Sequence, residues 1–123
     1  AVNEKMNILF AGPRNRKILT PLFEQPNAAK DFIAQVQQRI VSLEYAFANN
    51  LSLFGSVRVV NLEFEKHILI RFTINEWRTF QEVEAVYSHH HQDNNTDSFS
   101  FFCDFEPWSH RLRTTEFAVA YKN

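Results

Sequence analysis

From residue 55 onward, apolar and polar positions along the chain alternate with a period of two. That period is typical of half-buried β-strands, whose side chains point alternately to the two faces of a sheet. The alternating segments cover residues 55–64, 66–74, 83–87, 98–105 and 116–121, and short polar stretches separate them. This spacing predicts an all-β chain that folds as an antiparallel, immunoglobulin-like β-sandwich.

One face of each predicted strand collects the apolar side chains and is expected to point into the core. The predicted core residues are Val57, Val59, Ile68, Ile70, Phe72, Phe99, Phe101, Phe117 and Val119. Cys103 shares the face of Phe99 and Phe101, so we expect a buried thiol. As the single cysteine of the chain, it has no partner for an internal disulfide.

Ahead of the strands, the apolar positions take helical spacing. They are Phe32, Ile33, Val36 and Ile40. This spacing predicts a short amphipathic helix over residues 28–39, with Asn27 as its N-cap. The preceding apolar segment, residues 18–23, contains Pro21, which has no N–H group to donate, so a strand there must lie at a sheet edge.

Length and composition agree with one β-rich domain. The chain has 123 residues, enough for one core, and contains 13 Phe but only 2 Gly and 1 Met. A net charge of −1 removes the electrostatic attraction on which nucleic-acid binding depends. No apolar window is long enough to span a membrane, and no signal-like stretch opens the chain, so we expect a cytoplasmic protein without a membrane span.

The charge is unevenly distributed along the chain. Residues 1–20 contain Lys5, Arg14, Arg16 and Lys17 against Glu4, a local charge of +3, which leaves −4 for the remainder. We predict a basic N-terminal arm over residues 1–17 and a sandwich module over residues 18–123. The arm is interpreted either as a solvated terminus or as a docking tail.

The sequence contains no motif that indicates a metal site, a cofactor site or a catalytic site. His89, His90 and His91 lie in the polar stretch 89–97, read as a loop, where consecutive side chains point in different directions and suit a metal poorly. The carboxylates expected mostly on solvated outer faces are Glu63, Glu65, Glu82, Glu84, Asp97, Asp104 and Glu116. Without a nucleophile motif or a phosphate-binding loop, we expect no enzyme activity, no cofactor and no metal site.

Trp77 is the most informative aromatic residue because it falls in a turn between two predicted strands. Asn75, Glu76 and Arg78 flank it. A ring flanked by amides and charges can stack on the CH face of a sugar while its neighbours bond the hydroxyl groups. The alternative is that Trp77 folds back over the end of the sandwich. Trp108, after Pro107, is expected only to pack on the core.

Several landmarks occur in a family-specific order. They are Gly55, Val57, Val59, Asn61, residues 64–66, Arg71, Thr73, Trp77, Tyr87, residues 97–101 and residues 116–121. This succession resembles carbohydrate-binding module family 21, the starch- and glycogen-binding β-sandwich. It is especially similar to the form found in glycogen-targeting regulatory subunits of type-1 protein phosphatase. The segment Pro21–Pro26 also resembles these subunits, and the likeness covers residues 19–121.

The resemblance implies a noncatalytic, glycogen-associated scaffold. It would bring the catalytic subunit of type-1 protein phosphatase to glycogen, or another α-glucan, and to glycogen-metabolising enzymes. Trp77 would contact the sugar, with Asn75, Lys66 and Tyr87 supplying hydrogen bonds or a second aromatic edge. Asn75 stands where the targeting subunits usually have Asp. The family's next segment, with a second sugar-binding Trp, would follow Asn123, so we expect weaker polysaccharide binding without it.

Two alternatives stay open at this point: a starch-binding module of an amylolytic enzyme, and an immunoglobulin-like interaction domain without a ligand. The family also docks the phosphatase through a basic-Val/Ile-x-Phe element ahead of the module. Ile8 and Phe10, with Lys5 upstream, match that element here. It would add a strand to a sheet edge of the phosphatase while two apolar anchors fill pockets. Residues 70–72 match the same pattern from inside a predicted core strand.

Overall fold

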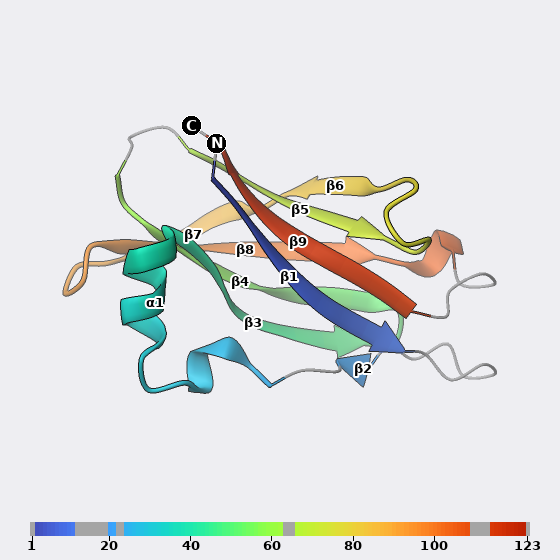
Figure 1. Cartoon of the computed structure of the whole chain (residues 1–123), viewed down its shortest axis with the longest axis horizontal. Coiled ribbons are helices and arrows are strands. Elements are labelled where there is room, and N and C mark those ends of the chain that lie inside the picture. The colour runs from blue at the N-terminus through green and yellow to red at the C-terminus, as the bar shows by residue number, and fades with distance from the viewer. Residues whose placement is uncertain (1, 12–19, 22–23, 63–65, 109–113, 123) are drawn as a thin grey trace.

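Two antiparallel β-sheets lie face to face in the computed structural model (Figure 1). It describes residues 2–11, 20–21, 24–62, 66–108 and 114–122, with only the backbone described for residues 2–11, 20–21 and 114. The two ends of the chain lie close together, where β1 and β9 run side by side (Figure 1).

Within the described residues, one sheet has five strands and the other has four. The order in the first is β2 (Thr20–Pro21), β1 (Val2–Ala11), β9 (Thr114–Lys122), β5 (His67–Thr73) and β6 (Gln81–Glu84). The order in the second is β3 (Val41–Asn49), β4 (Ser52–Val60), β8 (Thr96–Asp104) and β7 (Val86–His91). All neighbouring strands are antiparallel. The predicted antiparallel sandwich with one short helix is confirmed.

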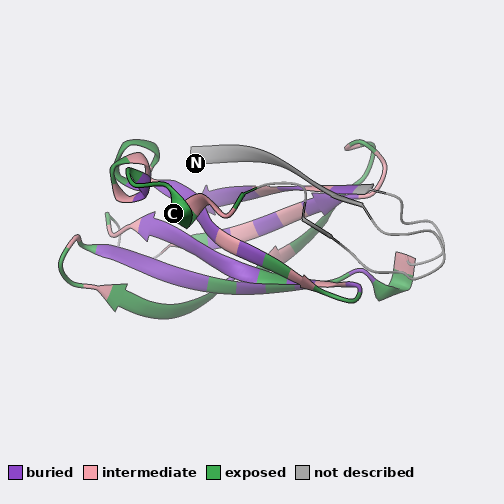
Figure 2. Cartoon of the chain, turned by 90° about the horizontal axis from the view of Figure 1, so that it is seen from below, coloured by how far each residue is buried: buried purple, intermediate pink, exposed green. Residues whose placement is uncertain are grey.

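The core fills the space between the two sheets, and Figure 2 marks the buried residues along the strands of both. All nine predicted core side chains are buried, none more than 6% exposed. Aromatic contacts join the sheets: Phe101 of β8 meets Phe117 of β9 with ring centroids 6.2 Å apart. Cys103 is fully buried, and burial raises the pKa of its thiol to about 12, as expected for a core thiol.

The helix is shorter than its sequence pattern predicted. A 3₁₀ turn, η1 (Pro26–Ala28), is followed by an extended Ala29, and α1 (Phe32–Arg39) begins only afterwards, with Asp31 at the N-cap position. The predicted start at residue 28 and the Asn27 cap are therefore wrong, because the extended Ala29 ends the first helical turn. Phe32 and Val36 are buried against the second sheet. No helix in the described ranges is long and apolar enough to cross a membrane.

Strand β3 was not predicted, because its burial does not alternate. Residues 41–44 are all buried, and a register shift in the pairing with β4 falls between Leu43 and Tyr45. Such a bulge places neighbouring side chains on unexpected faces and hides the period of two. The buried Glu44 beside Leu43 belongs to this irregular part of the strand.

The predicted strand over residues 83–87 is in fact two strands of different sheets. β6 ends at Glu84, Ala85 is buried with its N–H donating to the Ile68 carbonyl at 2.8 Å, and β7 begins at Val86 in the other sheet. The histidines were expected in a loop, yet His89–His91 belong to β7 and pair with β8. The chain thus crosses between the sheets at Ala85, a feature that local alternation cannot show.

Residues 2–11 of the predicted basic arm form β1, which pairs with β9 inside the first sheet. The predicted boundary at residues 17 and 18 and the charges of Arg14, Arg16 and Lys17 lie outside the described residues. β2, which contains Pro21, is the outermost strand of its sheet, so the expected edge position is confirmed.

Gly55 is the position where the backbone tolerates no side chain, and it yields a stability prediction. A Cβ built there would lie 2.2 Å from the Tyr45 carbonyl oxygen and 2.8 Å from the Phe101 ring. We expect Gly55→Ala to lower the unfolding free energy by about 2 kcal/mol or more, because β3 or the core must shift. Urea denaturation measures this. Ser100→Ala, at an exposed position of β8, should change stability by less than about 0.5 kcal/mol. Equal stability of the two variants would contradict the expectation.

Candidate functional site

The turn between β5 and β6 has an unusual backbone. Glu76 and Trp77 both have positive φ, 59° and 68°, and the Arg78 N–H approaches the Asn75 carbonyl at 3.4 Å. Two successive positive φ angles are characteristic of a turn that Gly and Asn normally occupy. A bulky residue in this region costs on the order of 1–2 kcal/mol. Bulky side chains occupy both positions, so Trp77 is held where it is against local strain.

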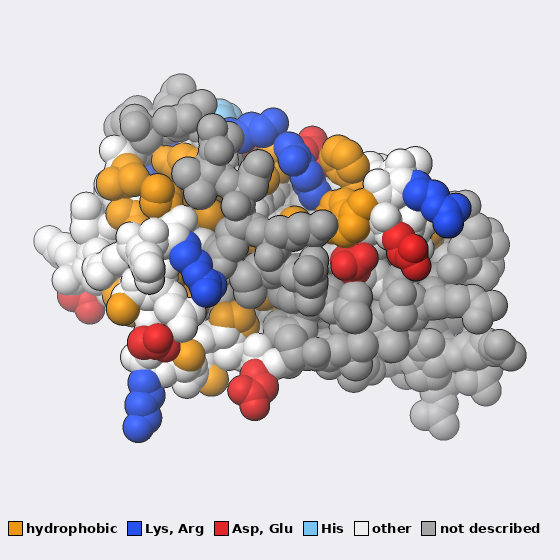
Figure 3. Space-filling model, viewed as in Figure 1, with side chains coloured by type: hydrophobic (Ala, Val, Ile, Leu, Met, Phe, Trp, Pro, Cys, Tyr) orange, Lys and Arg blue, Asp and Glu red, His pale blue; other side chains and the backbone are white. Residues whose placement is uncertain are grey.

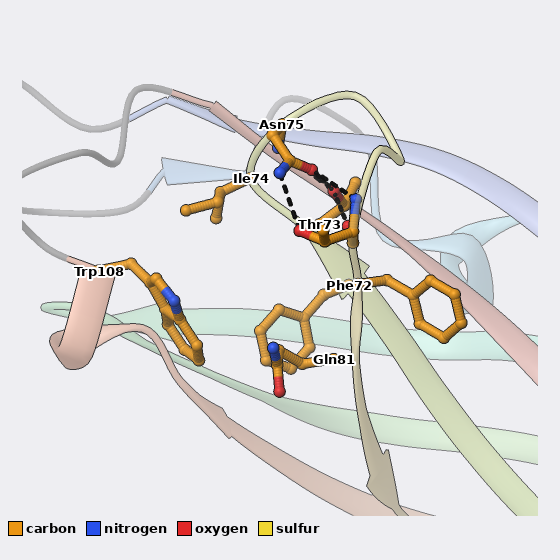
Figure 4. Close-up of a pocket in the computed structure, with 8 residues that line it drawn as sticks. Phe72, Thr73, Ile74, Asn75, Gln81 and Trp108 are labelled. Atoms are coloured by element: carbon orange, nitrogen blue, oxygen red, sulfur yellow. Dashed lines mark hydrogen bonds between the residues drawn. The ribbon is translucent and has the colours of Figure 1, made fainter.

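A hydrogen-bond network centred on Thr73 holds this turn. The Thr73 hydroxyl accepts from the N–H groups of Asn75 at 3.2 Å and Trp77 at 3.1 Å, and lies 2.6 Å from the Thr79 carbonyl. The Asn75 amide donates to the Thr79 hydroxyl at 2.8 Å, and its oxygen accepts the Thr79 N–H at 3.1 Å (Figure 4). The Thr115 hydroxyl ties the Thr73 carbonyl to β9 at 2.7 Å. The turn is therefore anchored to the body of the sheet.

A shallow pocket opens beside this turn. Its lining residues are Phe72, Thr73, Ile74, Asn75, Thr79, Phe80, Gln81 and Trp108. Figure 4 shows Trp108 and Ile74 facing Phe72 and Gln81 across it. Its cavity volume is about 70 Å³, well below that of a pocket that encloses a ligand. Rings and amide groups thus line a shallow, open depression beside the turn.

Trp108 contributes to this pocket, a role that sequence reasoning missed. As expected, it packs on the core, edge-on to Phe72 with centroids 5.8 Å apart. The 3₁₀ helix η2 (Glu106–Trp108) after β8 also brings it opposite the β5–β6 turn (Figure 4). No local signal identifies this partnership, because the two segments are separated by some thirty residues and meet only in the folded chain.

Phe80 connects the pocket with Trp77. Its ring is 49% exposed, lies 6.4 Å from the half-buried Trp77 ring, and also lines the pocket. The Arg71 guanidinium lies 5.5 Å over the Phe80 ring and 2.5 Å from the Glu82 carboxylate. Hydrophobic side chains accordingly reach the surface beside charged ones near this end of the sandwich (Figure 3). Aromatic faces and hydrogen-bonding groups are thus adjacent here, as sugar binding requires.

Of the four predicted sugar-contacting residues, the structure brings only Trp77 and Asn75 together. Lys66 lies at the opposite end of β5, where its Nζ is 3.0 Å from Asp97 Oδ2 and donates to Asn61 Oδ1 at 2.8 Å. Seven residues of extended chain, roughly 23 Å, separate Lys66 from Thr73. Tyr87 belongs to the other sheet, 55% exposed and edge-on to Phe99.

The predicted docking residues lie in β1. In the register of that strand, Ile8 is opposite Phe117 and Phe10 is opposite Thr115. The side chains of Lys5, Ile8 and Phe10 lie outside what the structure describes. The backbone of Ile8 and Phe10 is paired with β9, so these two residues are part of the sandwich in this conformation.

The histidine stretch makes hydrogen bonds to β8. His90 Nδ1 lies 2.6 Å from Asp97 Oδ1, and His91 Nε2 lies 2.7 Å from the Ser98 hydroxyl. In the described part of the chain, no three His, Cys, Asp or Glu side chains are grouped as a metal site requires.

Asp97 was expected on a solvated face but is buried, 4% exposed, between Lys66 and His90. Burial by itself raises the pKa of Asp97, but the hydrogen bonds and charges of His90 and Lys66 outweigh this and lower its pKa. At Glu44, the raising effect of burial on the pKa is likewise outweighed by Arg58, Ser56 and Ser98. Both carboxylates are therefore ionised and paired in the folded chain.

Comparison with known proteins identifies a sequence family. The carbohydrate/starch-binding module (family 21) matches residues 35–123. Glycogen-binding subunit 76A of Drosophila melanogaster is 37% identical over 93% of this chain, and protein phosphatase 1 regulatory subunit 3A of Homo sapiens is 30% identical over 85%. The matches span only 17% and 10% of those two relatives.

The fold agrees with a solved structure of the same family. That structure is the solution structure of the carbohydrate-binding module of the muscle glycogen-targeting subunit of protein phosphatase-1. It superimposes with a TM-score of 0.65 at 31% identity, covering 86% of this chain and 78% of the other.

The lowered pKa values of Asp97 and Glu44 predict an acid-sensitive fold. Because each folded-state pKa lies below the ordinary value near 4, the stabilisation is present above that value and is lost as pH falls through the folded pKa. We expect the unfolding free energy to fall from about pH 5 downward. In Asp97→Asn the fall should be shallower, and stability at pH 7 lower by about 3 kcal/mol, because the Lys66 ammonium loses the opposite charge of Asp97 while it stays shielded from water.

Urea denaturation at a series of pH values measures both effects. Glu84→Gln is a suitable control because Glu84 forms an exposed pair with His67, and it should keep the wild-type slope. A wild-type slope in Asp97→Asn would show that Asp97 does not contribute to the acid sensitivity.

Proposed function

The chain belongs to carbohydrate/starch-binding module family 21, and on this premise we propose that it is the noncatalytic, glycogen-binding module of a subunit that targets type-1 protein phosphatase to glycogen. The names of its relatives, a glycogen-binding subunit and a phosphatase regulatory subunit, support this proposal. The whole protein would associate with glycogen in the cytoplasm and with enzymes that metabolise it.

Trp77 on its strained turn is the observation that carries the proposal. A left-handed Trp costs stability, and such strain clusters at binding sites, where the geometry it maintains is useful. The ring lies beside Phe80, and Phe80 adjoins a pocket with the Asn75 and Gln81 amides in its lining. A glucosyl ring would stack on these aromatic faces while the amides bond its hydroxyl groups.

The proposed roles of the other predicted residues follow from their positions. Both ends of the Asn75 amide bond Thr79, so Asn75 acts mainly as a positioning residue for the turn. Gln81 is exposed and lines the pocket, which makes it a better candidate for bonding sugar hydroxyls. Lys66 would stabilise the module from its far end, and Tyr87 would take part only in a separate sugar contact.

One stacking site implies weak binding to a single glucan end. By analogy with base stacking, one aromatic ring contributes on the order of 1–3 kcal/mol. Glycogen presents many chain ends, so retention would come from rebinding and from additional sites rather than from one tight contact.

Phosphatase docking through residues 5–10 would use β1, either displaced from β9 or by its other edge. β2 pairs with that edge only at Phe10 and Ala11 among the described residues. An extended segment next to an open edge suits strand addition to a partner's sheet. The basic charge of Lys5 and of Arg14, Arg16 and Lys17 would speed association with an acidic partner, so the association rate should fall with salt.

Replacement of Trp77 tests the sugar site. We expect Trp77→Ala to weaken maltooligosaccharide binding by about tenfold or more, because the stacking ring is lost. The measurement is titration of a soluble maltooligosaccharide, followed by amide chemical shifts. Glu76→Gly is the matched variant: it relieves strain in the same turn, keeps the ring, and should retain binding.

A folded Trp77→Ala variant that responds to the sugar as strongly as the wild type would reject this site. In that case Trp77 would be a structural residue of the turn, and the pocket would need another assignment.

Replacement of Ile8 and Phe10 by Ala tests the docking proposal. Capture of the phosphatase catalytic subunit should be lost, because both anchors are removed, while glycogen retention should stay within about twofold of the wild type. Since both residues belong to β1, urea denaturation must accompany the pull-down. Undiminished phosphatase capture by a folded double variant would place docking elsewhere.

A further inference from the structure

The outer face of the second sheet carries exposed aromatic rings on three adjacent strands. We call Tyr45, Phe47, Phe54 and Phe102 the aromatic row. In the strand register, Phe47 of β3 is opposite Phe54 of β4, which is opposite Phe102 of β8. These three Phe side chains are 45%, 40% and 57% exposed. Contiguous apolar exposure of this kind marks a binding surface more often than a packing accident.

The rings on β3 and β4 contact one another, and Phe102 of β8 follows in the register. The centroids of Tyr45 and Phe47 are 5.5 Å apart, and those of Phe47 and Phe54 are 6.1 Å apart, with tilted planes in both pairs. Polar residues border the row toward the β3–β4 hairpin, where Ser52 is opposite Asn49 and Asp104. The row therefore offers aromatic faces bordered by hydroxyl, amide and carboxylate groups.

We propose that the aromatic row is a second glucan-binding surface, which takes the continuation of an α-glucan chain whose end occupies the Trp77 site. This inference rests on the proposed function. Ring faces bordered by hydroxyl, amide and carboxylate groups suit a polyhydroxylated chain, whose CH groups stack while its hydroxyls are bonded at the rim. Protein-binding surfaces are typically also enriched in Met and Arg, and the row contains neither.

The row is continuous with the site already described. Phe102 is followed by Asp104, which accepts the Glu106 N–H at 2.9 Å, and then by η2, whose Trp108 lines the pocket. The six residues from Phe102 to Trp108 span at most about 20 Å even when fully extended. The β3–β4 hairpin, η2 and the β5–β6 turn all lie at the same end of the sandwich (Figure 1). A long glucan can therefore reach both surfaces, whereas a trisaccharide is confined to one.

The test compares binding of maltotriose and maltodecaose by the whole chain, measured by calorimetry or amide shifts. For Phe54→Ser with Phe102→Ser, we expect about tenfold weaker maltodecaose binding, because two stacking rings are lost, and maltotriose binding within twofold of the wild type. Trp77→Ala should weaken both ligands. Leu62→Ser removes an apolar side chain that is 60% exposed, outside the row, and should weaken neither.

Wild-type maltodecaose binding by the folded double variant would overturn the proposal, even with the Trp77 site intact. If the wild type bound neither maltotriose nor maltodecaose, the proposed glycogen-binding function would be contradicted as well. Sedimentation could also show that the wild type is a dimer and the double variant a monomer, with sugar binding unchanged. The row would then be a contact between copies of the chain, which also overturns the proposal. Should the double variant not fold, Phe102→Ser, which alters the most exposed ring, provides the same comparison.

Discussion

The facing inner surfaces of the two sheets are the constraint on which the other features depend. Because side chains alternate along a strand, packing one residue into the core forces its neighbour outward. Phe101 packs against Phe117, so Phe102 reaches the solvent, and Leu53 is buried, so Phe54 is exposed. A register slip of one residue would turn the core side chains of a strand to the solvent. The close fit of Gly55 against β3 and Phe101 therefore matters, because it opposes such a slip.

The end of the molecule that carries the proposed sugar site combines a rigid support with local strain. Thr73 is buried at the end of β5, bonded to β9 through Thr115, and its hydroxyl organises the turn. A turn held so firmly can keep Trp77 in a left-handed conformation that an isolated peptide would avoid. The strain lowers the stability of the fold, but it holds the Trp77 ring in position before a ligand binds. Binding then costs less conformational entropy.

The opposite end of the molecule uses buried charge instead. Lys66 pairs with Asp97, and Arg58 with Glu44, each pair largely shielded from water. Pairs of this kind add little net stability, but removal of one partner is costly because the other charge stays buried. The Arg58 guanidinium also lies 5.9 Å from the ring of Phe32, a residue of α1, which packs on the second sheet. These two buried ion pairs thus lie away from the proposed sugar site.

The sequence by itself determined the class of fold, the nine core residues, the edge position of Pro21 and the turn that carries Trp77. Each of these follows from local periodicity or from the chemistry of one residue, and such information is contained in a short segment. Only the tertiary structure decided that β3 is a strand, that the chain changes sheets at Ala85, and that Trp108 joins the Trp77 turn while Lys66 and Tyr87 lie elsewhere. These features depend on pairings between distant segments, whose register is set by the packed core and leaves no periodic trace in the chain.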